Sequence, residues 1–167
     1  QYIRHSSHPF YTPEPDVVHE LVGHTAMLAA PEWAELNRLF GEADMRTESE
    51  AAITRLGTVF WFVMEFGVCR EGDDIKAFGP GMLSSFGEIE HACTAGAACG
   101  KEEACVCDPE IEYRPPDFEE IETRPYDVTK YQPMLYLWDS FEQMFEQTSE
   151  FVKAWGTDAD TRRELHQ

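Results

Sequence analysis

The sequence lacks several features that would assign it to common classes of protein. It has no apolar run of about 20 residues and no charged-then-apolar N-terminus, so neither a transmembrane helix nor a signal peptide is predicted. Basic residues are scarce, since 13 Lys and Arg against 32 Asp and Glu give a formal net charge of −19. Nucleic acids and anionic membranes attract positive charge, so neither is an expected partner. The sequence also shows no internal repeat.

Evenly paired cysteines are missing as well. The chain has five cysteines, four of which cluster at Cys93, Cys99, Cys105 and Cys107. Their spacings do not form two C-x2-C pairs, so a loop with free thiols is favoured over a second metal site. Without a secretion signal, reduced cysteines predict a cytoplasmic protein.

The most informative stretch that is present contains His19, Glu20 and His24, directly after a proline-rich segment. The zinc-protease signature H-E-x-x-H spaces its histidines four apart on one face of a helix. Here the spacing is five, which turns the second side chain by about 140° on a regular helix, against about 40° for four. Both imidazoles can bind one ion only if the helix is locally distorted or one histidine lies at its end. Gly23 tolerates unusual backbone angles and so permits either.

A third candidate ligand, Glu65, lies in the otherwise apolar run 60–68. A buried carboxylate without a partner is costly, and an ion held by His19, His24 and Glu65 is the simplest partner that the sequence offers. Two imidazoles and one carboxylate, with other positions open, form the ligand set of non-haem Fe(II) oxygenases. A zinc hydrolase with Glu20 as general base is one alternative. An inactive fragment that only binds a metal or a partner is another.

The remaining sequence predicts a mainly α single domain with a few short strands over residues 1–156, and a polar tail over 157–167. Asp16 is the expected N-cap of the helix that contains His19. A second helix should begin at Pro31 and end at Gly41, and a third should begin with a capping box at Thr47. The buried face of the third helix should comprise Ile53, Leu56, Val59, Phe60 and Val63. Further along, we expect a loop over 70–74, a strand over 75–78, a turn over 79–81, a helix over 82–92, irregular strands within 111–128 and a helix from the Ser140 cap to Gly156.

Several stretches resemble the catalytic domain of the pterin-dependent aromatic amino acid hydroxylases, the family of phenylalanine, tyrosine and tryptophan hydroxylases. The matching stretches are residues 1–5, 11–24, 60–67, 81–88 and 132–133. The resemblance implies that family's helical catalytic fold, a mononuclear Fe(2+) site, tetrahydrobiopterin as reductant, O2, and an aromatic amino acid as substrate. The chain opens on Gln1 inside a matching motif, so we expect a partial catalytic domain. The family's stretch before this point supplies the aromatic stacking partner of the pterin, so iron binding could survive where coupled turnover fails.

The resemblance also implies roles for individual side chains. Arg4 is similar to the arginine that binds the substrate carboxylate, and a guanidinium fits a carboxylate bidentately. Glu20 would lie near the pterin, and Phe60 would lie near the iron, where the phenylalanine and tyrosine enzymes have Tyr. The residues expected to hold the amino-acid end of the substrate are Thr12, Gly81 and Ser84, and those expected to line its ring pocket are Pro15 and Trp61.

Two positions bear on the substrate. Trp61 is similar to the phenylalanine and tyrosine enzymes, whereas tryptophan hydroxylases have Phe there. Val128 aligns with an aliphatic residue in phenylalanine hydroxylase and with Asp in tyrosine hydroxylase. The resemblance therefore favours hydroxylation of L-phenylalanine to tyrosine. Asp127 lies next to Val128, so a one-residue shift in register would reverse the choice, and tyrosine or tryptophan hydroxylation stays open.

Overall fold

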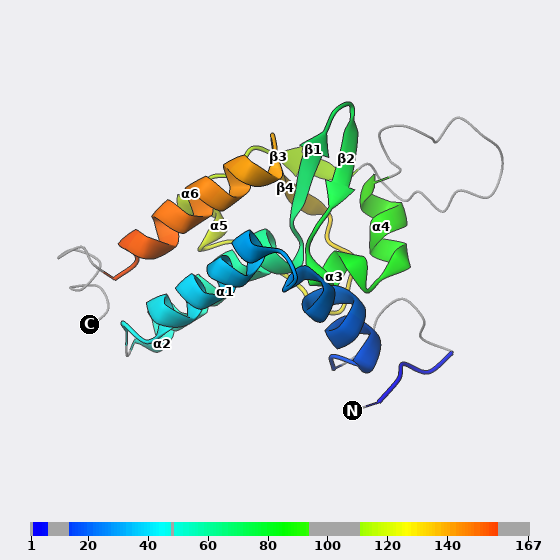
Figure 1. Cartoon of the computed structure of the whole chain (residues 1–167), viewed down its shortest axis with the longest axis horizontal. Coiled ribbons are helices and arrows are strands. Elements are labelled where there is room, and N and C mark those ends of the chain that lie inside the picture. Colours follow the sequence, from blue (N-terminus) through cyan, green and yellow to red (C-terminus); the bar gives the residue numbers. More distant parts are fainter. Residues whose placement is uncertain (1, 7–13, 48, 94–110, 157–167) are drawn as a thin grey trace.

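Helices dominate the computed structural model, which describes residues 2–6, 14–47, 49–93 and 111–156 (Figure 1). In chain order the elements are the π-helix η1 (His19–Thr25), α1 (Pro31–Asp44), α2 (Glu50–Val59), the π-helix η2 (Phe60–Glu65), β1 (Val68–Glu71), β2 (Asp74–Ala77), α3 (Pro80–Leu83), α4 (Phe86–Cys93), β3 (Glu112–Arg114), α5 (Phe118–Ile121), β4 (Met134–Trp138) and α6 (Phe141–Ala154). The prediction of a mainly helical domain with short strands is therefore consistent with the structure.

The four strands form one mixed sheet in the order β2-β1-β4-β3. Strands β1 and β2 form an antiparallel hairpin whose turn contains Gly72 at φ +63°, a backbone angle that favours glycine. Strand β4 runs parallel to both β1 and β3. The sequence did not lead us to expect β4, and the predicted loop over 70–74 was wrong because Arg70 and Glu71 complete β1.

The sheet separates two apolar clusters, because alternate side chains of a strand point to opposite faces. On one face Cys69, Met134, Tyr136 and Trp138 pack in the larger cluster, which includes residues of α1, α2, η2 and α6. On the other face Val68 and Leu135 pack with a smaller cluster that includes Phe66 and Met82. Helix η2 contributes to the larger cluster, and Phe66, the residue after it, belongs to the smaller one.

The helices begin much as the sequence predicts, with some differences at their ends. Residues 17 and 18 are α-helical and lead into η1, so Asp16 precedes the helical segment, and its Oδ1 accepts a hydrogen bond from the His19 N–H at 3.0 Å. Ser140 Oγ accepts one from Gln143 at 3.1 Å, so both predicted caps are confirmed. Helix α1 begins at Pro31 but continues to Asp44, so Gly41 does not end it. Glycine inside a helix costs only about 1 kcal/mol, which packing of the buried face of α1 offsets.

The expected start of α2 was wrong by two residues. Ser49 is its N-cap and accepts a hydrogen bond from Ala52, whereas Thr47 accepts one from Ser49. The buried stripe therefore passes through Ala52 rather than Ile53, which is 41% exposed. The helix expected over 82–92 is broken at Ser84 and Ser85 into α3 and α4, and within 111–128 there is one strand, β3, followed by α5, because Asp117 caps a helical turn there.

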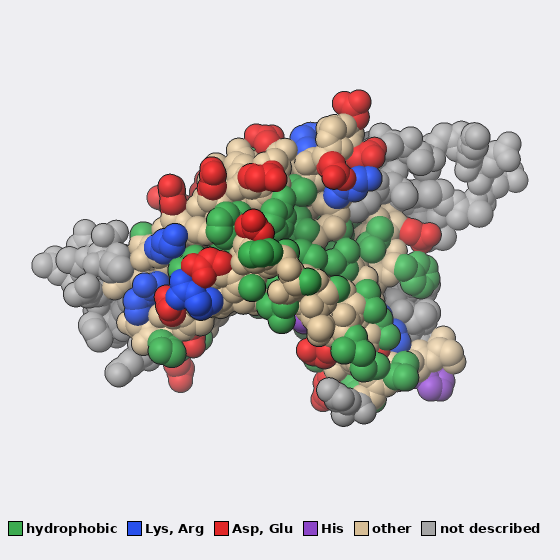
Figure 2. All heavy atoms as spheres, in the orientation of Figure 1, with side chains coloured by type: hydrophobic (Ala, Val, Ile, Leu, Met, Phe, Trp, Pro, Cys, Tyr) green, Lys and Arg blue, Asp and Glu red, His purple; other side chains and the backbone are tan. Residues whose placement is uncertain are grey.

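Acidic side chains outnumber basic ones on the face shown in Figure 2, in keeping with the net charge of the chain. Among the described residues, no helix is long and apolar enough to cross a lipid bilayer. Cys69 is buried and free. The other cysteine side chains and the tail 157–167 lie outside the described residues, so the predictions made for them stay predictions, as does the cytoplasmic location.

Candidate metal centre

The π-helix η1 explains how two histidines five residues apart lie on one face. In a π-helix each hydrogen bond joins residues five apart, so His19 and His24 lie one above the other. Their Nε2 atoms are 3.0 Å apart and their ring centroids 4.7 Å apart. The local distortion that the spacing required is present.

Gly23 contributes to this helix by close packing and not by an unusual backbone angle. A Cβ at this position would lie 2.9 Å from the carbonyl oxygen and 3.0 Å from the Cβ of Pro80, the first residue of α3. Its φ is not positive, so the expectation from backbone freedom was wrong. The missing side chain instead lets α3, and Ser84 just after it, approach η1.

Glu65 comes from the second π-helix, η2, which the N–H of Phe66 closes with a 3.0 Å hydrogen bond to the Trp61 carbonyl. Two glycines press against its main chain. A Cβ at Gly79 would lie 2.2 Å from the Glu65 carbonyl oxygen, and a Cβ at Gly81 would lie 2.9 Å from it. The Gly79–Gly81 segment therefore packs against the main chain of Glu65. This is where the structure places Gly81, one of the predicted site residues.

The three candidate ligands converge, and one ligand atom from each lies within 4.8 Å of the others. Glu65 Oε1 is 3.2 Å from His24 Nε2, and Glu65 Oε2 is 3.8 Å from His19 Nε2. An ion bonded at about 2.1 Å to three ligands at right angles would separate them by about 3.0 Å. The triangle is therefore of the size that a single divalent ion needs.

The charges of the triangle also suit a metal. Burial lowers the pKa of His19, which keeps its imidazole neutral, as a metal ligand must be. A hydrogen bond to Glu65 raises the pKa of His24, so a metal would have to displace a proton from this imidazole when it binds. Glu20 is exposed, and its negative charge acts on both histidines in the direction of a higher pKa.

A network of polar residues holds the Nδ1 side of the His19 imidazole. Ser84 Oγ lies 2.9 Å from His19 Nδ1, which leaves Nε2 directed at Glu65. Asp16 is buried and binds Arg4 bidentately, with Nε–Oδ2 and Nη2–Oδ1 distances of 2.9 Å. Arg4 Nη1 donates to the Ser84 carbonyl at 2.9 Å. The guanidinium of Arg4 holds the pKa of Asp16 well below its usual range. From the sequence we identified Asp16 only as a cap and missed its pairing with Arg4.

The other predicted site residues occupy varied positions. Pro15 is exposed, and Thr12 lies outside the described residues. The half-buried ring of Phe60 packs edge-on against Phe40 of α1, with centroids 5.2 Å apart, so its described contact is with the core. Trp61 is half-buried and stacks on Tyr126, with centroids 4.6 Å apart and planes at 15°.

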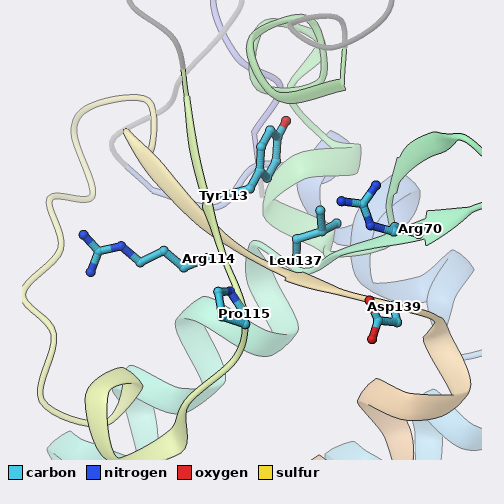
Figure 3. Close-up of a pocket in the computed structure, with 6 residues that line it drawn as sticks. All are labelled: Arg70, Tyr113, Arg114, Pro115, Leu137 and Asp139. Atoms are coloured by element: carbon cyan, nitrogen blue, oxygen red, sulfur yellow. The ribbon is translucent and has the colours of Figure 1, made fainter.

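A separate hollow of about 230 Å³ lies at the carboxyl ends of strands β1, β4 and β3 (Figure 3). The residues that line it are Arg70, Tyr113, Arg114, Pro115, Leu137 and Asp139. Arg114 points away from the other five in Figure 3 and pairs with Glu112 and Glu120. None of the predicted site residues lines this hollow, so it is not part of the metal centre.

Comparison with known proteins places the chain in a family. Residues 1–161 match the family described as biopterin-dependent aromatic amino acid hydroxylase. The chain belongs to this family. Protein henna of Drosophila melanogaster is 41% identical over 157 residues, which cover 92% of this chain and 31% of that protein. Phenylalanine-4-hydroxylase of Rattus norvegicus is 39% identical over 152 residues, which cover 91% of this chain and 30% of that protein.

The fold agrees with that of solved hydroxylases. The phenylalanine hydroxylase of Legionella pneumophila superposes with a TM-score of 0.74 at 28% identity, covering 98% of this chain and 58% of that one. The chain thus spans only about a third of the length of the first curated relatives and just over half of that structure.

Relatives with other names match almost as well. Tyrosine 3-monooxygenase of Drosophila melanogaster is 36% identical, over 99% of this chain and 26% of that protein. Phenylalanine 3-hydroxylase of Streptomyces coeruleorubidus is 38% identical, over 90% of this chain and 48% of that protein. Overall similarity therefore identifies the family and does not separate its substrates or ring positions.

Proposed function

We propose that this chain contains the iron-binding part of a tetrahydropterin-dependent monooxygenase that hydroxylates the ring of an aromatic amino acid. The observation that supports this most directly is the triangle of His19, His24 and Glu65 on two π-helices, within a chain of the hydroxylase family. π-Helical segments are rare and occur frequently at functional sites. The chain spans only about a third of the length of its first curated relatives, so the hydroxylase activity of the whole protein is itself proposed.

The donor set fits ferrous iron. His19 Nε2, His24 Nε2 and the Glu65 carboxylate would hold the ion and leave its other coordination positions open. When bound, the ion together with a tetrahydropterin would supply the two-electron activation of O2 that no side chain can perform. Ser84 keeps His19 in one orientation.

Substrate binding is assigned to the residues around this triangle. Arg4 would bind the substrate carboxylate, and its pairing with Asp16 holds the guanidinium beside Ser84. Thr12, Gly81 and Ser84 would hold the amino-acid end. Trp61 and Pro15 would line the ring pocket, Phe60 would lie near the iron, and Glu20 would lie near the pterin, as the family resemblance implies.

L-Phenylalanine is the proposed substrate, with tyrosine as product. Val128 supports this choice, since an aliphatic side chain at this position is typical of phenylalanine hydroxylases, and it is 50% exposed on the turn next to Tyr126. Trp61 argues against tryptophan. Tyrosine hydroxylation remains the alternative.

One experiment separates these activities. The protein is incubated with Fe(II), tetrahydropterin and O2, and phenylalanine, tyrosine and tryptophan are offered separately, with products identified by mass. We expect one added oxygen on phenylalanine, none with Glu65→Gln, and wild-type product with Glu146→Gln, which changes an exposed glutamate of α6. Stoichiometric zinc with peptidase activity and no pterin-dependent oxidation would instead support the hydrolase. Pterin oxidation without a hydroxylated amino acid, or no reaction, would support an inactive metal-binding fragment.

A further inference from the structure

Gln132 is a buried amide between η2 and the turn over residues 126–130. Its side chain is 2% exposed. Its Oε1 accepts a hydrogen bond from Trp61 Nε1 at 3.4 Å, and its Nε2 donates to the carbonyls of Asp127 and Lys130, both at 3.2 Å. An indole N–H can only donate, so the amide oxygen must face Trp61 and the N–H groups must face the turn. Because unpaired buried amide groups are costly, Gln132 stabilises one arrangement of these neighbours.

The Trp61 side of this arrangement belongs to the helix that contains Glu65. Trp61 lies four residues before Glu65 on η2, and its indole lies almost parallel to the ring of Tyr126, with centroids 4.6 Å apart. Phe62, the next residue of η2, meets the same tyrosine edge-on at 5.8 Å. Tyr126 is thus in contact with two aromatic side chains of the metal-ligand helix.

The turn is ordered locally but presents its apolar side chains outward. Asp127 Oδ1 accepts hydrogen bonds from the N–H and the hydroxyl of Thr129, at 2.9 Å and 2.6 Å. Lys130 Nζ lies 3.2 Å from Asp127 Oδ2. Tyr126 and Val128 are nevertheless 40% and 50% exposed. The local bonds fix the shape of the turn, and Gln132 fixes its position on η2.

We propose that Gln132 is a positioning residue for the amino-acid pocket, which holds the 126–130 turn against Trp61 and so sets where Val128 lies relative to Glu65. This inference rests on the proposed function and deepens it. Trp61 and Val128 are the two positions at which the sequence distinguishes among aromatic amino acids, and they lie 67 positions apart in the chain. The Gln132 side chain hydrogen-bonds both to Trp61 and to the turn that contains Val128.

The test compares Gln132→Met with Gln143→Met in the iron-loaded protein. Methionine has a similar length but makes no amide hydrogen bonds. Gln143 is a matched control because its amide also bonds at both ends, to the N–H and the carboxylate of Asp139, at the start of α6. We expect Gln132→Met to weaken L-phenylalanine binding, measured by calorimetry, about tenfold and to raise the KM for phenylalanine equally. The iron content and the KM for tetrahydropterin should not change, and Gln143→Met should leave all four values as in the wild type.

A second readout does not depend on activity. In Gln132→Met, hydrogen exchange followed by NMR should be about tenfold faster at the Trp61 indole N–H and at the amides of the turn. The signal that is missing in Trp61→Phe identifies the indole resonance. Gln132→Glu keeps the oxygen that accepts from Trp61 but loses both N–H donors to the carbonyls of the turn. Its exchange should therefore quicken in the turn and not at the indole, which keeps the test informative if Gln132→Met does not fold.

The outcomes separate this inference from the proposed function. If the wild type binds phenylalanine without hydroxylating it, and Gln132→Met still weakens that binding, the positioning role stands and the proposed function fails. If hydroxylation proceeds and Gln132→Met binds phenylalanine like the wild type, or no more weakly than Gln143→Met, the positioning role is overturned. Absence of any phenylalanine binding by the iron-loaded wild type would overturn both.

Discussion

Ser84 Oγ lies 2.9 Å from His19 Nδ1, although 65 positions separate the two residues in the sequence. This contact fixes the imidazole in the orientation that directs Nε2 at Glu65. Loss of such a partner commonly weakens metal binding by 10–100-fold. We therefore expect Ser84→Ala to weaken Fe(II) or Co(II) affinity, measured by anaerobic titration, by about that factor. Ser149→Ala removes a hydroxyl that is also buried, on α6, and should leave the affinity unchanged. Equal affinities for the wild type and Ser84→Ala would argue against the role of Ser84.

The pairing of Asp16 with Arg4 makes a second prediction. Asp16 accepts two hydrogen bonds from the Arg4 guanidinium and one from the His19 N–H. Removing one partner from a buried pair leaves the other uncompensated, which costs 3–5 kcal/mol where both are fully buried. Because the Arg4 side chain is partly exposed, we expect Asp16→Asn to lower the free energy of unfolding by about 2–3 kcal/mol in urea. Asp44→Asn, on the exposed end of α1, should change it by less than about 0.5 kcal/mol.

Close packing at Gly23 leads to a third prediction, which concerns stability and metal binding. A Cβ there would lie within 3.0 Å of Pro80, so Gly23→Ala must push η1 and α3 apart. Overpacking of this kind costs about 1–3 kcal/mol, and it should also weaken metal binding because Ser84 follows α3. Gly57→Ala is the matched control, since nothing lies within 4 Å of the added methyl group in α2. Alanine favours the helix, so this control should stabilise the protein by up to about 1 kcal/mol in thermal unfolding. Equal stability of the two variants would contradict the packing account.

The buried carboxyl of Glu88 predicts a dependence of stability on pH. Glu88 is fully buried, and neither of its oxygens has a hydrogen-bond partner within the part of the chain that the structure describes. Burial raises its pKa to about 8, although the nearby N–H of Gln132 acts in the opposite direction. In the folded protein the group therefore keeps its proton up to about pH 8, whereas in the unfolded chain it loses it near its ordinary pKa of 4.5.

Between these two values the folded state binds more protons, so stability falls as pH rises. Across this pH range the free energy of unfolding should fall by roughly 4–5 kcal/mol, at about 1.4 kcal/mol per pH unit. Glu88→Gln should remove this fall, so that its free energy of unfolding, measured in urea from pH 5 to 8.5, gains on that of the wild type as pH rises. Glu146→Gln should follow the wild type. Parallel curves for the wild type and Glu88→Gln would show that Glu88 is ionised in the fold.

Much of the helical framework could be predicted because it depends on local signals. Pro31, the Asp16 and Ser140 caps and the apolar stripe of α6 act within a few residues. The start of α2 was misjudged because Thr47 and Ser49 both offer a hydroxyl ahead of an acidic residue, and only packing of Ala52 distinguishes them. Strand β4 was missed because its burial on both sides removes the alternation of polar and apolar residues by which a strand is recognised.

The candidate metal centre was predictable in part because local patterns point to its three residues. The five-residue spacing of His19 and His24 required a distorted helix, and the apolar surroundings of Glu65 required a partner. The pairing of Asp16 with Arg4 and the bonds of Gln132 join segments far apart in the chain, and no local pattern reveals them. Gly23 illustrates the limit most clearly, since its sequence context suggests backbone freedom whereas its packing against Pro80 requires the absence of a side chain.

The central claim is that His19, His24 and Glu65 bind one metal ion together. Anaerobic titration of the metal-free protein with Fe(II), followed by analysis of bound metal, tests it most directly. We predict one ion per chain for the wild type and for Glu146→Gln, and loss of that ion in His24→Ala and in Glu65→Gln. Binding of an ion at wild-type affinity by both His24→Ala and Glu65→Gln, or no binding by the wild type, would contradict the claim.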